Sequence, residues 1–299
     1  MAHRLWAALL TFALIALAVG LLSLRGLNFG LDFTGGTLVE VGYSQAVELD
    51  RIRSALEAGG YPDAVVQNFG TARDVLIRLA PDAGEGDALS NAVLEVLRAD
   101  NADAELRRVE FVGPQVGEEL TEKGGLALLY ALAGILIYVA FRFEYRFAIG
   151  SVAAVVHDVV ITLGIFAGIG MTFDLTVLAA LLAVIGYSLN DTIVVFDRIR
   201  ENFIRMRKGS AVEVTNRSIN QMLPRTVVTS LTTLLVLLAL FLVGGELIRG
   251  FALALIIGVV VGTYSSIYVA GSAALALGVS KEDLIPPPKE GEDAEDERP

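Results

Sequence analysis

The stretch AVIGYSLNDTIVVFDRIREN, residues 183–202, decides what kind of protein this chain forms. It begins as an apolar run, yet Asn190 and Asp191 stand side by side near the end of that run. A charged side chain at the centre of a bilayer costs about 2.5–3.5 kcal/mol on insertion scales, so such residues usually face a bundle interior or a wet cavity. The stretch therefore predicts a membrane helix that carries a polar site.

The rest of the chain supports a membrane protein, since 54% of its 299 residues are hydrophobic. About 20 apolar residues are needed to cross a bilayer. Two long apolar segments, Phe147–Phe173 and Leu175–Phe196, are interrupted only by His157, Asp158 and Asp191. Four more runs contain no Asp, Glu, Lys or Arg: Leu5–Leu24, Gly124–Phe141, Thr226–Gly245 and Gly250–Ser280. The sequence thus predicts a polytopic α-helical membrane protein with six transmembrane helices.

The charges are distributed unevenly between the loops. Residues 26–122 contain 7 arginines and 18 acidic residues, whereas residues 197–225 contain 7 basic and 3 acidic residues. The positive-inside rule places the basic loop in the cytosol and the acidic segment outside, with both termini cytoplasmic. The first apolar run also resembles a signal peptide, because Ala16-Leu17-Ala18 suits cleavage. We interpret it as an uncleaved anchor, since the run continues past Ala18 and six spans require this helix.

The acidic segment 26–122 reads as a small external domain. Its pattern predicts strands at Thr37–Tyr43, Ala64–Asn68, Asp74–Leu79 and Glu105–Val112. One helix is expected at Glu48–Ala58, and a second between the third and fourth strands, where Leu89, Val93, Val96 and Leu97 form an apolar stripe. The order β-α-β-β-α-β predicts an α+β ferredoxin-like domain. Such a domain is more often a docking module than an enzyme, and we find no catalytic constellation in it.

We therefore divide the chain into four parts: a first transmembrane helix at 1–25, the external domain at 26–122, a five-helix transmembrane region at 123–280, and a tail at 281–299. The tail is rich in proline and acidic residues, which predicts disorder in the cytosol. In the last span, Gly258, Gly262, Ser266, Ala270 and Ala274 recur every four residues. This stripe of small residues predicts close packing against another helix.

Polar side chains recur at helical spacing in three consecutive spans. Asp158 lies one turn before Thr162, and Asp191 shares a face with Tyr187 and lies beside Asn190. In the next span Arg225, Thr229 and Thr232 form a third polar stripe. Together these groups could line a path for protons. The alternatives are a snorkelling Arg225 paired with an interfacial Asp191, a static hydrogen bond at Asp158, and an Asn190 that only joins two helices.

Several classes of chemistry are excluded or disfavoured. The chain has no cysteine and 2 histidines, so disulfides, thiolate nucleophiles and His or Cys metal clusters are excluded, and we predict no metal site. We interpret His157 as a packed histidine. Asp158 and Asp191 do not match the Tyr-Asp and Gly-x-Gly-Asp signatures of intramembrane aspartyl proteases. Ser188 lacks the second glycine of a nucleophile elbow. We therefore predict no catalytic residues and no enzymatic activity.

Six motifs resemble the SecF family, which provides the smaller membrane subunit of the bacterial SecD–SecF complex and is related to the resistance-nodulation-division transporters. They are Gly30-Leu-Asp-Phe-Thr-Gly-Gly36, with Asp32, Phe33 and Gly35, Val112-Gly-Pro-Gln-Val-Gly-Glu-Glu-Leu120, His157-Asp158, Ile185 to Asn202, Pro224-Arg-Thr-Val-Val-Thr-Ser-Leu-Thr-Thr233, and Gly262-Thr-Tyr-Ser-Ser-Ile-Tyr268. The resemblance covers nearly the whole chain except the tail.

This resemblance implies a subunit of the Sec protein-export machinery in the bacterial inner membrane. It implies that SecD, SecYEG and YajC are partners, that preproteins are the substrate and lipid the surroundings, and that nucleic acid is not bound. It also implies that the proton gradient, and no cofactor, supplies the energy. By the same analogy Asp191 and Arg225 take part in proton passage, Asp158 matches a motif position, and Asn190, Thr229 and Thr232 support them.

The sequence leaves two other functions open. One is a proton-driven exporter of a lipid or small hydrophobic molecule in the same superfamily, which would need a substrate pocket in the external domain. The other is a structural scaffold for assembly of the translocon. Substitution of Asp191 separates the scaffold from both transporters, and assays of preprotein export and of lipid efflux separate the two transporters.

Overall fold

The computed structural model describes residues 4–83, 86–143, 145–206 and 209–279. It contains six helices that are long and apolar enough to cross a membrane, as the sequence predicts. In chain order, the elements that build this membrane region are α1 Arg4–Arg25, α5 Pro114–Arg142, α6 Tyr145–Ile169, α7 Leu175–Arg205, α8 Ala211–Val243, α9 Glu246–Ser265, a π-helical turn Ser266–Ala270 and α10 Gly271–Ala276. The sixth span consists of α9, the π turn and α10 together.

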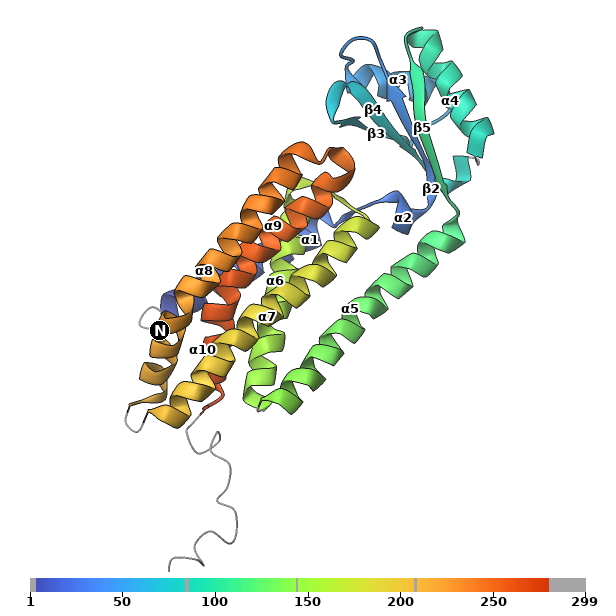
Figure 1. The fold of residues 1–299 in the computed structure, drawn as a ribbon. Helices are drawn as coiled ribbons and strands as arrows, with labels where there is room; N and C mark the ends of the chain where they lie inside the picture. Colours follow the sequence, from blue (N-terminus) through green and yellow to red (C-terminus); the bar gives the residue numbers. More distant parts are fainter. Residues whose placement is uncertain (1–3, 84–85, 144, 207–208, 280–299) are drawn as a thin grey trace, which may run out of the picture.

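The external domain is a four-stranded antiparallel sheet with two helices on one face (Figure 1). Its strand order is β3-β4-β2-β5, and the elements along the chain alternate as predicted for a ferredoxin-like domain. They are β2 Gly36–Gly42, α3 Leu49–Ala58, β3 Val65–Phe69, β4 Thr71–Leu79, the short 3-10 helix Pro81–Ala83, α4 Gly86–Asp100 and β5 Glu105–Val112. The predicted fold class is thus confirmed for the membrane region and the domain alike.

The domain forms because its strands and helices each present one apolar side. Val39 and Val41 of β2, and Val75 and Ile77 of β4, are fully buried, and α3 and α4 cover them with Leu56 and Val93 among others. The two helices are amphipathic, as their sequence spacing predicts. The buried residues form a hydrophobic cluster separate from those of the membrane helices.

Three very short elements join the domain to the membrane region. They are β1 Asn28–Phe29, α2 Leu31–Thr34 and β6 Thr172–Phe173. β1 pairs in parallel with β6, which lies between α6 and α7. From the external domain, the Arg78 guanidinium on β4 donates a hydrogen bond to the Phe29 carbonyl oxygen on β1. The joint therefore links α1, the sheet and the α6–α7 connection.

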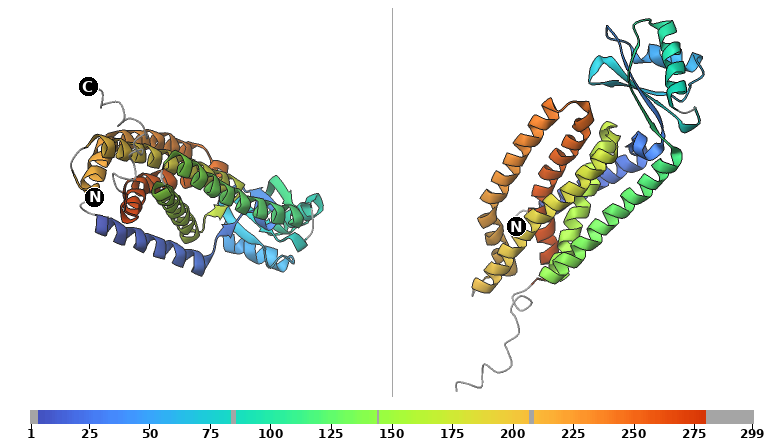
Figure 2. Two further views of the ribbon diagram at one scale, coloured as in Figure 1. Left: turned by 90° about the horizontal axis from the view of Figure 1, so that it is seen from below. Right: turned by 45° about the vertical axis from the view of Figure 1, so that its right-hand side comes forward.

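The membrane helices differ in how much of their surface this chain covers. In α6 and α7, 50% and 44% of the span window is buried, whereas in α1 the share is 6%. α1 lies along the outside of the bundle (Figure 2). Phe147 of α6 and Phe196 of α7 pack edge to face with ring centroids 4.6 Å apart, and both rings are fully buried. The core of the bundle therefore lies between α6 and α7.

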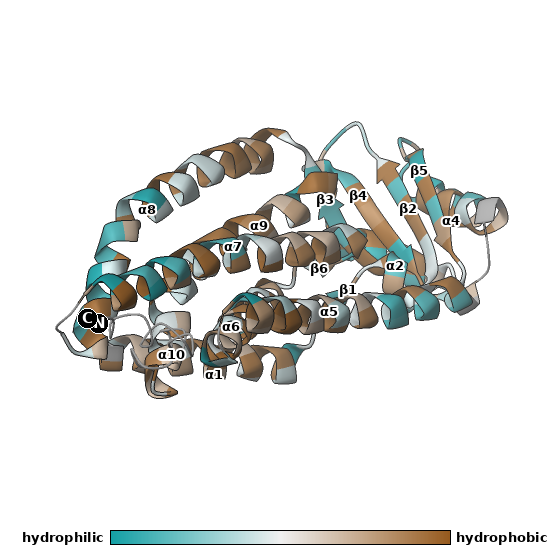
Figure 3. Ribbon diagram, turned by 60° about the horizontal axis from the view of Figure 1, so that its bottom comes forward, coloured by the Kyte–Doolittle hydropathy of each residue, from teal (hydrophilic) through white to brown (hydrophobic). Residues whose placement is uncertain are grey.

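The two ends of the bundle carry different connections. The end of α5 with the start of α6, the end of α7 with the start of α8, and the end of α10 lie at the end of the bundle remote from the external domain (Figure 1). Polar residues gather at this end of α7 and at the start of α8, while the middle of the helices is apolar (Figure 3). α5 begins at Pro114, nine residues before the predicted start of the five-helix region at 123, and its first residues lie next to the sheet (Figure 1). The predicted disordered tail lies outside the described residues.

We expect Gly36→Ala to destabilise the external domain. Gly36 has φ +114°, and a Cβ atom there would collide with the Leu79 carbonyl oxygen on the paired strand β4. Backbone in this region costs a residue other than glycine of order 1–3 kcal/mol before any clash. Gly60→Ala is the matched control, because Gly60 also has positive φ, at +93°, but a Cβ there meets nothing within 4 Å. Protease resistance of the domain in the full-length chain should fall more for Gly36→Ala, and equal loss would contradict the clash.

Candidate functional site

Asp158 lies in the middle of α6 and is almost completely buried, with 1% of its surface exposed. Its carboxylate oxygen Oδ2 accepts hydrogen bonds from Ser188 Oγ on α7 at 2.5 Å and from Ser265 Oγ on α9 at 2.7 Å. Its other oxygen, Oδ1, lies 2.8 Å from Nδ1 of His157. Asp158 thus joins α6, α7 and α9 through one carboxylate.

His157 is buried as well, and its Nδ1 is satisfied by Asp158. Its second ring nitrogen, Nε2, has no hydrogen-bond partner in the described part of the chain. The ring lies against Tyr264 of α9, with centroids 6.0 Å apart. A packed histidine was predicted at this position; the structure shows a ring that is packed and hydrogen-bonded through one nitrogen.

Asp191 forms a second carboxylate site, on α7. Its Oδ1 accepts a hydrogen bond from Thr226 Oγ1 on α8 at 2.9 Å, and its Oδ2 accepts one from Ser266 Oγ at 2.6 Å. Thr226 and Ser266 are buried, while Asp191 itself is partly exposed at the surface of this chain. No ion pair to Asp191 is present among the described residues. Its partners there are hydroxyl groups.

The polar stripe predicted on α8 does not turn toward Asp191. Arg225, Thr229 and Thr232 are exposed, and the two threonine hydroxyls donate to carbonyl groups of α8 itself. Thr226 faces α7 instead, because neighbouring residues on a helix with 3.6 residues per turn point about 100° apart. Asn190 is exposed too. Asp191 and Arg225 therefore form no ion pair in this arrangement. Such a pair stays a prediction that requires another arrangement of α7 and α8.

Sequence reasoning missed that serine and threonine hydroxyls bind the two carboxylates, Asp158 and Asp191. From the sequence, Ser188 is considered as a nucleophile and as a neighbour of the polar face of Asp191, and Ser266 as a small residue in a packing stripe, but neither is assigned to a carboxylate. Four consecutive residues of the sixth span each reach a different helix. Thr263 contacts Ser230 on α8 at 2.7 Å, and Tyr264 donates to the Ala7 carbonyl on α1 at 2.8 Å. Ser265 and Ser266 bind the carboxylates on α6 and α7.

The stripe of small residues lies against α7 and α6, as predicted. A Cβ atom at Gly258 would collide with the Val184 side chain. A Cβ at Gly262 would lie 3.3 Å from Cβ of Ser188 and 3.5 Å from Oδ2 of Asp158. The absence of a side chain at Gly262 therefore lets Ser188 and Ser265 reach the same carboxylate oxygen.

Gly262→Leu should accordingly prevent α9 from approaching α7, since a leucine side chain would need the space that Ser188 and Asp158 fill. We expect less full-length chain in the membrane and earlier aggregation on heating. Gly20→Leu on α1 is the control, because a Cβ there meets nothing within 4 Å. Normal accumulation and heat resistance of the Gly262→Leu protein would contradict this packing.

The motif Gly30–Gly36 builds the joint below the external domain. Asp32 Oδ2 accepts a hydrogen bond from the Leu175 backbone N–H at 2.9 Å, and Asp174 Oδ1 accepts one from Val177 N–H at 2.9 Å. Two carboxylates thus occupy the N-terminus of α7, where free N–H groups and the helix dipole favour negative charge. Phe33 stacks on Phe173 with centroids 5.6 Å apart.

Two positions of this motif require glycine because another segment of the chain lies close to their backbone. Gly35 has φ +66°, and a Cβ there would lie 3.0 Å from Cα of Pro114, at the start of α5. A Cβ at Gly30 would lie 3.0 Å from Cβ of Asp174. The two positions bring α2 against α5 and against the start of α7. The motif is therefore structural in this conformation.

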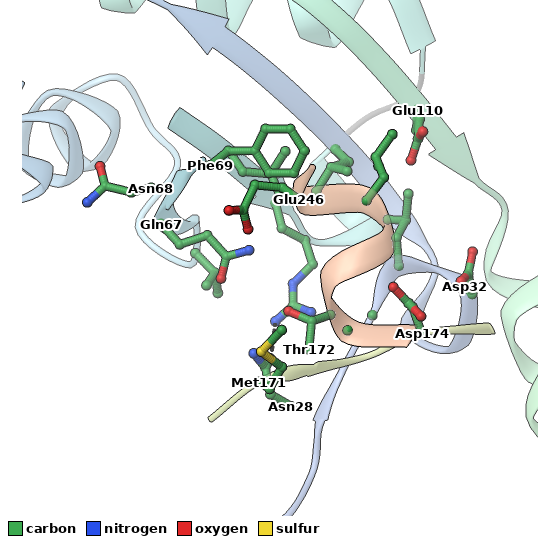
Figure 4. A pocket seen from close by; sticks show the side chains of 18 of the residues that line it. Asn28, Asp32, Gln67, Asn68, Phe69, Glu110, Met171, Thr172, Asp174 and Glu246 are labelled. Carbon is green, nitrogen blue, oxygen red and sulfur yellow. Dashed lines mark hydrogen bonds between the residues drawn. The ribbon is translucent and has the colours of Figure 1, made fainter. Parts of the chain in front are cut away.

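A cavity of ≈ 350 Å³ lies between the open face of the sheet and the end of the membrane region next to it (Figure 4). Gln67 and Phe69 of β3, Thr172 of β6 and Glu246 at the start of α9 are among the residues that line it. The remaining charged groups in its wall are Asp32, Arg78, Arg108, Glu110 and Asp174. Burial lowers the pKa of Arg78 from its ordinary value. The wall is thus strongly charged.

Six membrane spans, two carboxylates within them and an external α+β domain define a polytopic membrane protein of the transport class. The family model for the protein export membrane protein SecD/SecF, C-terminal, matches residues 92–280, and the model for the SecD/SecF GG motif matches residues 20–47. The protein translocase subunit SecF of Vibrio alginolyticus is 56% identical over 96% of this chain and 92% of its own. That of Pseudomonas aeruginosa is 52% identical over 97% of this chain and 94% of its own.

The chain belongs to the SecF family of protein translocase subunits. The crystal structure of SecDF from Thermus thermophilus, a translocon-associated membrane protein, matches with a TM-score of 0.85 and 43% identity over 93% of this chain. A second SecDF structure, in a super-membrane-facing form, matches with a TM-score of 0.69 and 44% identity. This chain spans 38% of the length of each of those two chains. The family resemblance predicted from the motifs is confirmed, and the protein is a multi-pass membrane protein that serves protein transport.

Proposed function

We propose that this chain is the SecF half of a SecD–SecF pair that uses the proton gradient to assist preprotein passage through SecYEG, with Asp191 as the group that carries the proton. The observation that supports this most is the set of partners of Asp191. Its carboxylate meets the hydroxyls of Thr226 and Ser266 rather than a permanent cation. A hydroxyl can donate to a carboxylate or accept from a carboxylic acid after a rotation, so both charge states of Asp191 can be hydrogen-bonded.

The proposal for SecD as the partner rests on the exposed polar face of α7 and α8. Asn190, Arg225, Thr229 and Thr232 lie on the surface of this chain within spans that cross the membrane. Polar groups facing lipid are costly, so this face needs a cover that offers hydrogen bonds. The solved SecDF chains are more than twice as long as the part that this chain matches, and SecD helices fit the role of that cover. YajC is a further partner in this proposal, and the complex needs no cofactor and catalyses no covalent reaction.

The energetics suit a proton-driven step. A charge that crosses the membrane yields about 2.3 kcal/mol per 100 mV. A few kcal/mol is enough to bias an element with two positions. In our proposal Arg225 approaches Asp191 in the ionised state and withdraws when Asp191 is protonated. Such a movement requires α8 to turn by about the angle that separates Arg225 from Thr226.

The exporter of a lipid or small hydrophobic molecule is the alternative. It would need an apolar pocket in the external domain. The cavity beside the sheet contains Phe69 but also Asp32, Arg78, Arg108 and Glu246, and it lies against the membrane region rather than inside the domain. These charges do not suit an apolar substrate, so preprotein export remains the better supported function.

Asp191→Asn tests the proposed role of the proton. The amide keeps the volume and can accept hydrogen bonds, but it cannot change charge. Export stimulated by the gradient should be lost, while export driven by ATP alone and assembly in the membrane should persist. Asp197→Asn is the control, because Asp197 is an exposed acid on the same helix that pairs with Arg142 at 3.2 Å. Full gradient stimulation with Asp191→Asn in assembled complexes would remove Asp191 from the mechanism and leave it a structural residue.

The proposed orientation places the external domain in the periplasm and both termini in the cytoplasm of a bacterial inner membrane. The chain has no cysteine, so single cysteines report the side of the membrane without background. Ser54 on α3 and Asn220 near the start of α8 are exposed. An impermeant thiol reagent should label Ser54→Cys, but not Asn220→Cys, in cells whose outer membrane is permeabilised. The reverse pattern would overturn this topology.

A further inference from the structure

The sixth span changes its helical form beside the two carboxylates. α9 is α-helical to Ser265, and the next five residues, Ser266–Ala270, form a π-helical turn. π turns are rare and occur frequently at functional sites. Ser265 binds Asp158 and Ser266 binds Asp191, so the change of form falls between the two residues that hold the two carboxylates.

Each of these serine hydroxyls has a second acceptor in reach, in its own helix. Ser265 Oγ lies 2.7 Å from Oδ2 of Asp158 and 3.2 Å from the Gly262 carbonyl oxygen. Ser266 Oγ lies 2.6 Å from Oδ2 of Asp191 and 3.1 Å from the Thr263 carbonyl oxygen. A hydroxyl has one proton to donate, so a stronger bond to one acceptor weakens the bond to the other.

The charge on the carboxyl group decides between the two acceptors. Hydrogen bonds to an ionised group are roughly twice as strong as those between neutral groups. Ionised Asp191 therefore holds the Ser266 hydroxyl, whereas neutral Asp191 competes poorly with the carbonyl of Thr263. Ser and Thr hydroxyls that bond back to their own helix also bend it slightly. The form of the helix at Ser266 thus depends on the charge of Asp191.

One carbonyl group links the two serines. The Gly262 oxygen accepts the backbone N–H of Ser266 and is also the second acceptor for the Ser265 hydroxyl. When Ser266 shifts, the hydrogen bond from its N–H to the Gly262 oxygen becomes weaker or stronger. The Gly262 oxygen then becomes a better or a poorer acceptor for the Ser265 hydroxyl. The Ser265 bond to Asp158 changes accordingly. A Cβ atom at Gly262 would lie 3.5 Å from Oδ2 of Asp158, and Ser265 is completely buried.

We propose that Ser265 and Ser266 form a hydroxyl switch that makes the hydrogen bonding of Asp158 depend on the charge of Asp191. The two serines are positioning residues, and Asp158 is the second group that responds. The inference rests on the proposed function only in requiring that Asp191 change its charge during transport. It assigns to the buried carboxylate on α6 a place in the same cycle, which the contacts of Asp191 alone do not give.

Infrared spectroscopy of the full-length chain in lipid tests the switch, because carboxyl band positions report hydrogen bonding directly. The Asp158 band is identified as the one lost in Asp158→Asn. We expect Asp191→Leu, which can neither ionise nor accept a hydrogen bond, to shift that band. In a Ser265→Ala, Ser266→Ala background the same Asp191 substitution should shift it by less than half as much. An equal shift in both backgrounds, or none in the native background, would overturn the proposal.

Controls keep the result specific. Thr233→Val removes a hydroxyl of α8 that donates to the Thr229 carbonyl, so it should leave the Asp158 band and its shift unchanged. If Asp191→Leu does not accumulate, Asp191→Asn replaces it, since the neutral amide also removes the charge. Normal gradient-stimulated export with Asp191→Asn would contradict the proposed function and leave the band shift in place. If the Asp158 band shifts equally with and without Ser265 and Ser266, while Asp191→Asn still abolishes gradient-stimulated export, only the switch is contradicted.

Discussion

The structure depends on a set of hydrogen bonds that one turn of the sixth span makes to its neighbours. Successive residues of a helix point about 100° apart, so four in a row sweep the whole circumference. Thr263, Tyr264, Ser265 and Ser266 do so and reach α8, α1, α6 and α7 in turn. Association of helices in lipid lacks a hydrophobic driving force, so close packing and such polar contacts hold the bundle together. This turn therefore holds four of the other spans by hydrogen bonds.

The turn Thr263–Ser266 and the joint below the external domain both bind α7, at different points along that helix. α7 receives Asp32 at its N-terminus and carries Asp191 four turns further along. A helix is stiff over this length, so a shift at one end reaches the other. The joint and the proposed proton site are thus connected by a rigid element with a hydrogen bond at each end. This arrangement would relate the proposed protonation of Asp191 to the domain outside the membrane.

The sequence was informative where long patterns decide the structure. Twenty apolar residues in a row or an alternation of β-formers leave few alternatives, so the six spans and the ferredoxin-like domain could be predicted. The side of α8 that faces α7 and α9 could not be predicted. Thr226 and Ser230 lie about 100° from Arg225 and Thr229, both faces carry hydroxyls, and only the packing of α7 and α9 decides between them. Serine is both small and polar, so Ser265 and Ser266 were equally consistent with packing and with binding a carboxylate. The role of Asp32 depends on a partner 143 residues away and has no local signal.

The chain enters and leaves the external domain at neighbouring points, next to Gly35. The chain enters the domain at Gly36 and leaves it at Val112, and these two residues are paired across β2 and β5. Gly35 also touches the start of α5. Entry and exit thus share one point. A rotation of the domain about this point would keep β2 and β5 paired, and it would displace residues far from the point more than those beside it.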